Sequence, residues 1–240
     1  MSEGEQAAKE APVPFLARLA PGDLDALQVV ARRRRLPRGA VVFWEGDAAD
    51  DVMILVSGRM KAWVASPEGR EVILNLLDAG DILGELSAID GATRSATVTT
   101  LEPVEVLIIP RVGFEDLLAT RPGIALEMLR IVTQRLRETS QRQLEFATVD
   151  ALGRLCRCLL DLADRYGEAA PDGRQVLVPF AQHDLAAWSG LSREAVVKGL
   201  RALRTLGWIQ TSGRSLTLLD EDAVRGRARP PAAVEPRRRP

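Results

Sequence analysis

The chain has few of the residues that build covalent crosslinks, metal sites and membrane spans. It contains two cysteines and one histidine in 240 residues, and 4% of its residues are aromatic. Cys156 and Cys158 stand two positions apart in a helical pattern, so they point to different faces and cannot easily pair. The longest apolar runs, such as Val52–Val56, span about five residues, whereas a membrane helix needs roughly 20. We therefore expect a cytoplasmic protein without a disulfide framework and without a membrane partner.

The overall charge says little about partners. The net charge is -1, but residues 1–149 carry 17 Lys and Arg against 22 Asp and Glu, while residues 150–240 carry 15 against 11. An acidic half joined to a basic half suggests two modules, the second of which meets a polyanion. Most of the basic excess lies in the Arg-rich stretch 225–240, so composition supports nucleic-acid binding only weakly.

The first part of the chain changes from a helical to a strand-rich pattern. Phe15–Leu36 is predicted to be helical with a break at Pro21-Gly22, and Arg32–Arg35 is interpreted as the solvated end of that helix. Between Gly39 and Pro110, short β-rich runs alternate with turn signals at roughly ten-residue spacing. This alternation of short strands and turns is typical of a small antiparallel barrel or sandwich.

A long helix is predicted from Ile124 to about Phe146. A heptad seam follows one face of it, through Ala125, Leu129, Val132, Leu136, Thr139, Gln143 and Phe146. The seam favours pairing with a second copy of the chain, and the alternative is a helix that packs on its own barrel. Met128 and Ile131 lie off the seam, where they can meet the barrel. The polar Thr139 and Gln143 either set the register of the pair or face a ligand.

The last part of the chain follows the order helix, short glycine-containing turn, helix, hairpin. This order describes a winged helix-turn-helix. The predicted elements are a helix at 151–166, a turn-rich loop at 167–174, a short strand at 175–180, helices at 182–188 and 193–206, and a hairpin at 208–219. Residues 223–240 are expected to form a disordered Arg- and Pro-rich tail.

A candidate phosphate site lies in the strand-rich part. Gly84 can expose backbone N–H groups to an anion, and Glu85 can accept from a ribose hydroxyl. Nine residues later, Arg94 supplies a planar cation for two phosphate oxygens and Ser95 a hydroxyl donor. Each residue alone is a weak signal, but the spacing of the set, written in full as Gly84-Glu85-Leu86-Ser87 and Arg94-Ser95, is a stronger one.

A candidate DNA-reading helix begins after Ser192, which is a good N-cap. Val196, Leu200 and Leu203 form its inward stripe. The outward side chains are Arg193, Glu194, Val197, Lys198 and Arg201, and Arg214 stands at the tip of the predicted wing. Arginine and lysine can donate to guanine, and glutamate can accept from cytosine. The bland alternative is a solvated amphipathic helix, but the glycine turn before it and the hairpin after it favour DNA.

These motifs, taken in order over roughly residues 14–222, resemble the cyclic-AMP receptor (catabolite activator) family of bacterial transcription regulators. The resemblance implies an α+β protein with an N-terminal antiparallel β-roll, the cyclic-nucleotide-binding jelly-roll. The expected parts are a cyclic-nucleotide-binding domain at 14–148 with a dimerisation helix at about 124–146, a winged helix-turn-helix DNA-binding domain at 149–222, and the tail at 223–240.

The resemblance also implies a ligand and its contacts. Cyclic AMP would be the effector, with Gly84 and Glu85 at the ribose and Arg94 and Ser95 at the cyclic phosphate; Leu86 and Ser87 complete this cassette. Thr139 would contact adenine from the same subunit and Ser140 from the partner subunit. Branches of the superfamily that sense through an iron–sulfur cluster or haem do not fit two cysteines on one helix and a lone His183, so no metal, haem or cluster is expected.

The resemblance implies a homodimer that binds a palindromic double-stranded DNA with TGTGA-type half-sites, and no enzyme. The chain departs from the family pattern at Lys198, where arginine is expected, and at Ala195, where threonine is common. Whether RNA polymerase is a further partner stays open. Two alternatives remain: DNA binding that is independent of cyclic AMP or answers another nucleotide, and a nucleotide-sensing regulatory subunit whose winged helix binds a protein.

Overall fold

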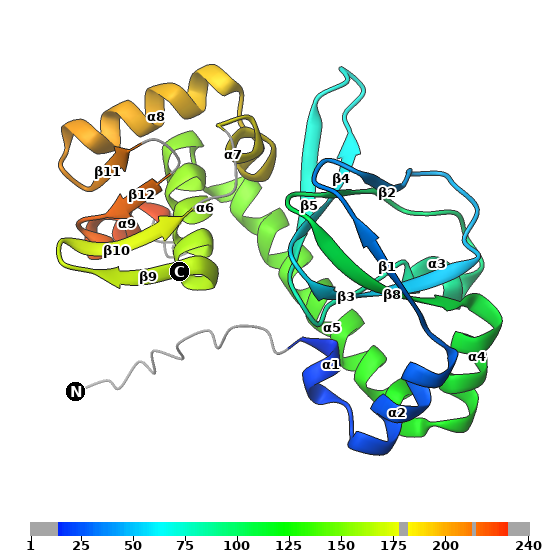
Figure 1. Cartoon of the computed structure of the whole chain (residues 1–240). Helices are drawn as coiled ribbons and strands as arrows, with labels where there is room; N and C mark the ends of the chain where they lie inside the picture. Colours follow the sequence, from blue (N-terminus) through cyan, green and yellow to red (C-terminus); the bar gives the residue numbers. More distant parts are fainter. Residues whose placement is uncertain (1–13, 178–181, 213–214, 230–240) are drawn as a thin grey trace, which may run out of the picture.

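The structure is a computed structural model that describes residues 14–177, 182–212 and 215–229. It contains an N-terminal barrel and a C-terminal helical body with its own small sheet, and a long helix joins them (Figure 1). This is the predicted α+β architecture. None of the described helices combines the length and the apolar character that crossing a membrane requires.

The barrel consists of two four-stranded antiparallel sheets. Their strand orders are β1-β8-β3-β6 and β2-β7-β4-β5. The strands are β1 (Arg32–Leu36), β2 (Val41–Phe43), β3 (Asp51–Ser57), β4 (Met60–Ala65), β5 (Glu71–Leu77), β6 (Ile82–Leu83), β7 (Thr97–Thr100) and β8 (Val104–Pro110).

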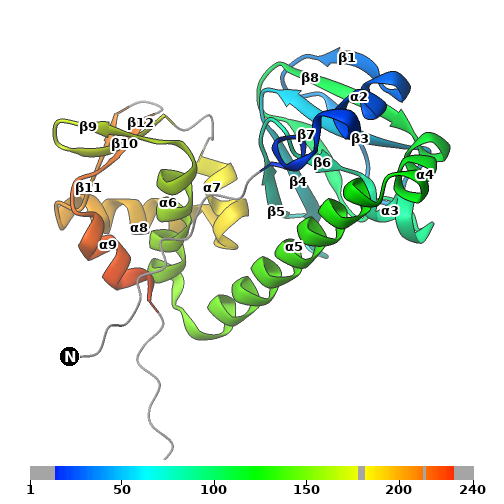
Figure 2. The ribbon, with the colours of Figure 1, turned by 90° about the horizontal axis from the view of Figure 1, so that it is seen from below.

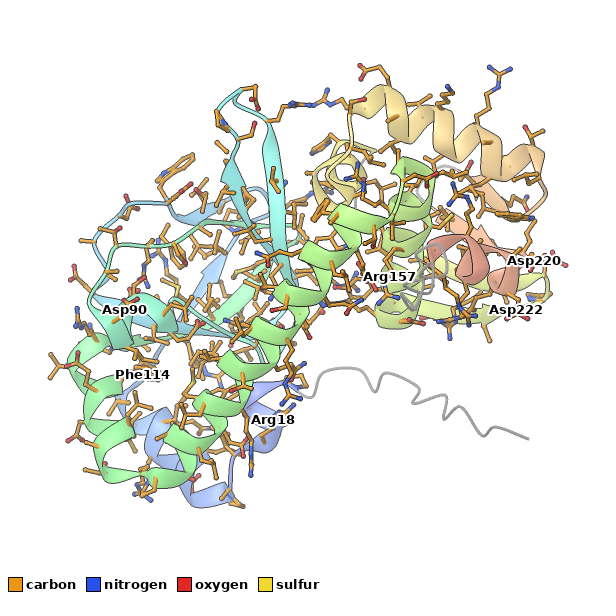
Figure 3. The ribbon with its side chains drawn as sticks, turned by 180° about the vertical axis from the view of Figure 1, so that it is seen from behind. Arg18, Asp90, Phe114, Arg157, Asp220 and Asp222 are labelled. Atoms are coloured by element: carbon orange, nitrogen blue, oxygen red, sulfur yellow. The ribbon has the colours of Figure 1, made fainter. Side chains whose placement is uncertain are left out.

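Strand β3 contributes side chains to two separate hydrophobic clusters. Successive side chains of a strand point to opposite faces. Met53 and Leu55 join the cluster inside the barrel, while Val52 and Ile54 join a second cluster beneath the helices. The second cluster also holds Phe114, which is labelled in Figure 3. A strand that is apolar on both faces therefore ties the barrel to the helices that cover it.

The interpretation of Arg32–Arg35 as a helix end is wrong. Helix α1 (Phe15–Arg18) is followed by α2 (Pro21–Val30), and the four arginines form strand β1, which pairs antiparallel with β8. The alternate residues Arg33 and Arg35 flank Glu105 of β8, with Arg35 Nε 2.9 Å from its carboxylate. Cross-strand pairing and opposite charge decide the conformation here, and neither is visible in a short run of like residues.

Three further helices belong to the barrel: α3 (Glu85–Asp90), α4 (Arg111–Thr120) and α5 (Pro122–Thr148). Pro122 begins α5, where its missing N–H costs no hydrogen bond. Met128 and Ile131 are buried against the barrel, as predicted. The seam face of α5 lies open, with Leu129 and Leu136 each 65% exposed. Figure 2 shows α5 running along the barrel and turning into α6 at its far end.

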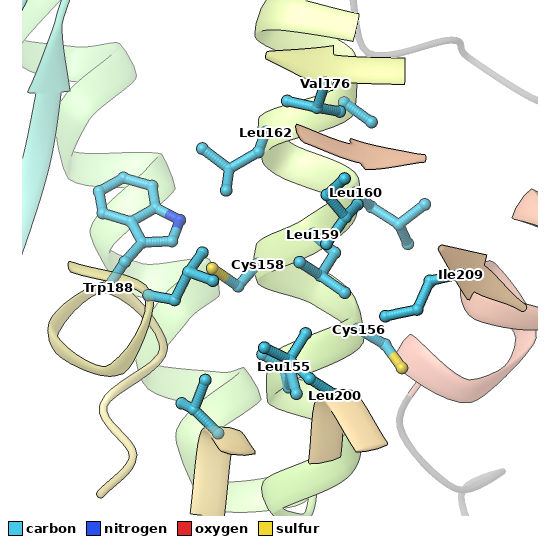
Figure 4. Close-up of a cluster of buried hydrophobic side chains, with 14 of the residues drawn as sticks. Leu155, Cys156, Cys158, Leu159, Leu160, Leu162, Val176, Trp188, Leu200 and Ile209 are labelled. Carbon is cyan, nitrogen blue, oxygen red and sulfur yellow. The ribbon is translucent and has the colours of Figure 1, made fainter. Parts of the chain in front are cut away.

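The C-terminal body is built around α6 (Ala151–Tyr166). Its other elements are β9 (Gly167–Ala170), β10 (Gly173–Leu177), α7 (Gln182–Ser189), α8 (Arg193–Thr205), β11 (Ile209–Ser212), β12 (Ser215–Leu218) and α9 (Glu221–Ala228). Leucines of α6 fill the centre of the core (Figure 4). The thiols of Cys156 and Cys158 are both free and buried, and they point to different sides of α6, as the spacing predicts.

Two predictions for this body need correction. Residues 167–174 are not a loop but contribute to the hairpin β9–β10, which extends the sheet to the order β11-β12-β10-β9. Residues 223–228 are not a disordered tail but belong to α9, whose Val224 and Ala228 are buried in the core. These two apolar residues lie four apart on one helix face, a signal that the surrounding arginines obscure. Residues 230–240 lie outside the described residues.

Candidate functional site

A cavity of about 230 Å³ lies between the sheet β2-β7-β4-β5, helix α3 and helix α5. It brings together seven of the predicted ligand residues: Gly84, Glu85, Leu86, Ser87, Arg94, Ser95 and Thr139. Ser140 does not line it. The hydroxyl of Ser140 donates to the carbonyl of Leu136, 2.9 Å away, on the exposed side of α5.

Arg94 is a buried residue of the cavity wall, with 4% of its surface exposed. Its Nη2 donates to the Asp51 carboxylate at 2.6 Å and to the Asp51 carbonyl at 2.9 Å, and its Nη1 donates to the carbonyl of Gly84 at 3.0 Å. The guanidinium also lies 4.3 Å from the centre of the Phe43 ring. Its buried Nε–H has no hydrogen-bond partner among the described residues. A rigid cation with a nitrogen that lacks a hydrogen-bond partner suits an anionic ligand.

Two features of the structure require a glycine at position 84: the backbone conformation there and the nearby side chain of Arg94. Its φ of +78° lies in the left-handed region, where it caps the N-terminus of α3. A Cβ atom at this position would collide with the Arg94 guanidinium. The glycine therefore lets the arginine approach the backbone of the turn.

Glu85 is 2% exposed and forms an ion pair with Arg135 of α5. Arg135 Nη2 also donates to the carbonyl of Ile82 at 2.7 Å. Sequence reasoning missed Arg135, although it stands one helical turn before Thr139 and that spacing places both on one face. It also missed Asp51, which no local pattern connects to Arg94.

The remaining cassette residues have different surroundings. Ser87 is buried and its hydroxyl donates to the carbonyl of Thr93 at 3.0 Å, so it braces the loop before Arg94. Leu86 is 41% exposed, and Ser95 is exposed. Thr139 is exposed on the seam, with its hydroxyl 2.9 Å from the carbonyl of Arg135. Leu86, Ser95 and Thr139 therefore remain accessible from the open side of the cavity.

A second candidate surface is the outer face of α8. Ser192 caps the helix by accepting from the Ala195 N–H at 3.1 Å. The predicted inward stripe is confirmed, because Val196, Leu200 and Leu203 are buried. The predicted reading residues Arg193, Glu194, Lys198 and Arg201 are all exposed. Arg214 lies outside the described residues.

Glu194 is held as a charged acceptor. Its own backbone N–H and the Ser192 hydroxyl hydrogen-bond its carboxylate, and these bonds lower the pKa of Glu194. Such a carboxylate can accept from a base amino group at neutral pH.

The turn between α7 and α8 has the geometry of a helix-turn-helix. Gly190 adopts a φ of +64°, and the Leu191 N–H donates to the Ala186 carbonyl at 3.0 Å. The Phe146 ring at the end of α5 packs against Gly190 so closely that a Cβ there would lie 2.6 Å from it. His183 is exposed, and within the described ranges no three His, Cys, Asp or Glu side chains gather as metal ligands.

Comparisons with known proteins match both bodies. The cyclic nucleotide-binding domain family matches residues 33–121, and the Crp-like helix-turn-helix domain family matches residues 153–227. The chain is 34% identical over 193 residues to the CRP-like cAMP-activated global transcriptional regulator of Mycobacterium tuberculosis, covering 80% of this chain and 86% of the relative. It is 30% identical over 218 residues to the cyclic AMP receptor protein of Thermus thermophilus, covering 88% and 96%.

Among solved structures, the c-di-GMP responsive global regulator CLP of Xanthomonas campestris superposes with a TM-score of 0.76 at 26% identity, covering 83% of this chain and 99% of that chain. The Mycobacterium relative is named as a transcriptional regulator and not as an enzyme. The chain belongs to the Crp family of transcription regulators, which bind a cyclic nucleotide and DNA.

Proposed function

We propose that the protein is a homodimeric regulator that binds cyclic AMP in the barrel and then binds a palindromic DNA site. The observation that carries the proposal is the cavity in which Arg94, Glu85 and Thr139 meet. It offers a cation, a carboxylate and a hydroxyl to one ligand. The sensing unit would be residues 14–148 and the DNA-binding unit residues 149–229.

The cyclic phosphate would bind at Arg94 and Ser95. The buried Nε–H of Arg94 supports this assignment, because a phosphate oxygen would supply its missing acceptor. The carboxylate of Glu85 would accept from the ribose hydroxyl, with the turn at Gly84 beside it. Arg135 would hold Glu85 in position through their ion pair.

The base would lie toward α5, where Thr139 can both donate and accept. Ser140 is exposed and does not line the cavity of its own chain, which supports a role in the cavity of a partner subunit. A ligand that touches helices of both subunits would favour one arrangement of the pair over another. Only such differential affinity can shift a conformational equilibrium.

A cyclic dinucleotide is the second candidate effector, since the Xanthomonas regulator is named as responsive to c-di-GMP. The cavity volume of about 230 Å³ favours the mononucleotide. It lies below the roughly 300–1,000 Å³ of pockets that enclose drug-sized ligands. A second base would have to lie outside it.

The homodimer would form along the open seam of α5. A partner helix would cover Leu129 and Leu136, which are apolar and 65% exposed. Leu136→Lys places an unpaired charge in that seam, and we expect the dimer to dissociate at micromolar concentration. Sedimentation velocity checks this result, with Arg137→Lys of the same helix as the control. A Leu136→Lys protein that stays dimeric would contradict dimerisation along this seam.

DNA would be read by α8. In a dimer the two copies of this helix would enter successive major grooves, about 34 Å apart. Arg193, Glu194 and Lys198 would contact base edges, Arg201 would supplement them, and the Ser192 cap and the wing with Arg214 would contact phosphates.

Calorimetric titration with cyclic AMP tests the proposal. Wild type should bind, and Arg94→Ala should bind about 10- to 100-fold more weakly, because hydrogen bonds to a charged group are lost. Arg38→Ala removes an exposed arginine remote from the cavity and serves as the control. Cyclic GMP and c-di-GMP, titrated in parallel, decide between effectors. Failure of wild type to bind millimolar cyclic AMP would falsify the assignment.

A further inference from the structure

The C-terminal body docks directly onto the barrel of its own chain. Helix α7 packs against β5. Ile73, Leu76 and Leu101 of the barrel belong to the same buried cluster as the leucines of α6. The barrel and the C-terminal body therefore contact each other directly, in addition to being joined through α5.

A buried ion cluster lies in this interface. Lys61 of β4 is 7% exposed, and its Nζ lies 2.9 Å from the carboxylate of Asp184 of α7 and also pairs with Glu71 of β5. Burial lowers the pKa of Lys61, but hydrogen bonds and charges from Glu71 and Asp184 outweigh it, so the net shift is upward. Undocking would separate Asp184 from the Lys61 ammonium, while Glu71 would stay beside that ammonium on the barrel. The cluster therefore favours the docked arrangement.

A second polar contact holds the other end of the interface. The hydroxyl of Tyr166 donates to Asp78 at 2.9 Å. Arg165 lies 3.6 Å from the same carboxylate and donates to the Leu76 carbonyl at 3.3 Å. The end of α6 is thereby fixed to the turn after β5.

Arg142 of α5 belongs to both the cavity and this interface. It lines the cavity together with Leu74 and Thr139. Its Nη1 donates to the Leu74 carbonyl at 2.6 Å, and its guanidinium lies 4.0 Å from the centre of the Trp188 ring of α7. Trp188 is itself buried among the core residues of the C-terminal body (Figure 4). One cation thus touches the proposed nucleotide cavity and the helix-turn-helix at once.

We propose that Arg142 couples the cavity to the docking of the DNA-binding unit, because a nucleotide and Trp188 compete for its guanidinium. The inference rests on the proposed nucleotide site. A base beside Thr139 offers a π face and ring nitrogens to the same cation that now stacks on Trp188. A guanidinium that turns toward the base leaves the indole. Nucleotide binding therefore weakens docking, and by linkage docking weakens nucleotide binding.

A double-mutant cycle tests the coupling. Asp184→Asn weakens the ion cluster and Tyr166→Phe removes the donor to Asp78, and neither residue lines the cavity. Each should tighten cyclic AMP binding by about fivefold or more, the lower end of usual couplings. In an Arg142→Met background the same substitutions should leave the affinity unchanged. Arg137→Met, an exposed arginine of the same helix, is the control background and should preserve the gain.

Hydrogen exchange without ligand reports docking independently. Amides of α7, which packs against β5 and does not line the cavity, should exchange faster in Tyr166→Phe than in wild type, and addition of cyclic AMP to wild type should speed the same amides. Docking variants that bind cyclic AMP no tighter than wild type would overturn the coupling, as would a gain that persists in Arg142→Met. If wild type binds no cyclic nucleotide, the proposed function fails and the coupling with it; binding without coupling removes only this inference.

Discussion

The cavity of the barrel and the outer face of α8 hold their charged residues in opposite ways. In the cavity, Arg94 is buried and bound to Asp51, and Glu85 is buried and paired with Arg135. The residues of α8 that are proposed to read DNA are exposed, and the helix alone positions them: Arg193, Glu194, Lys198 and Arg201. Substitutions in the cavity should therefore change folding and ligand binding together, whereas substitutions of these four exposed side chains of α8 should change DNA binding alone.

The largest effect should come from Gly84→Ala in the cavity. The left-handed φ costs a side chain about 1–2 kcal/mol, and the collision of the new Cβ with Arg94 adds about 1–3 kcal/mol. We expect the free energy of unfolding, measured in urea, to fall by about 2–5 kcal/mol. Gly39→Ala is a matched control, because its φ of +76° is similar but nothing lies within 4 Å of the new Cβ. Equal losses in the two variants would contradict the role of Arg94.

The next effect should appear on α8 with Arg193→Ala. Loss of a base contact should cost about 1–3 kcal/mol, which is about 5- to 150-fold in affinity for the palindromic duplex. Fluorescence anisotropy at fixed salt, with a scrambled duplex as the reference, measures it. The free energy of unfolding should stay within about 0.5 kcal/mol of wild type, as is usual for exposed sites. A large loss of stability in Arg193→Ala would contradict the claim that this residue, unlike those of the cavity, plays no part in folding.

The sequence predicted the local elements of the DNA-binding unit well. The helices of the helix-turn-helix and the inward stripe of α8 follow from apolar periodicity and from the Ser192 cap, which are local signals. The errors occurred where partners come from far along the chain. Arg32–Arg35 forms a strand because it pairs with β8. The segment after Tyr166 forms a hairpin because its second strand, β10, pairs with β12.

The same distinction applies to the cavity. Spacing along the chain singled out Gly84, Glu85 and Arg94, because one turn and one loop hold them. It could not find Asp51 or Arg142, since Asp51 meets Arg94 across 43 positions of sequence and Arg142 meets Leu74 across 68. The docked interface was also invisible, because its ion pair joins Lys61 to a residue 123 positions away.

Smaller effects should distinguish Ser192, the cap of α8, from Ser140 on α5. Ser192→Ala removes the cap of α8 and should lower the free energy of unfolding by about 1 kcal/mol. Ser140→Ala removes only a hydroxyl bonded within its own helix, so stability should hold while the dimer binds cyclic AMP more weakly. Urea unfolding and calorimetry measure the two quantities. Unchanged cyclic AMP affinity in Ser140→Ala would remove the partner's serine from the proposed site.

The smallest effect should be a gain, from Lys198→Arg on α8. Lysine reaches a guanine as a point charge, whereas arginine presents a planar fork that donates to O6 and N7 together. Since Lys198 is exposed, the longer side chain should not disturb the core. We expect binding to the palindrome to tighten by about two- to fivefold, equivalent to about 0.5–1 kcal/mol, with no change in unfolding. A panel of duplexes substituted at each half-site position should show the gain at a single base pair. A gain spread evenly over all duplexes would instead mean that this side chain contacts phosphate.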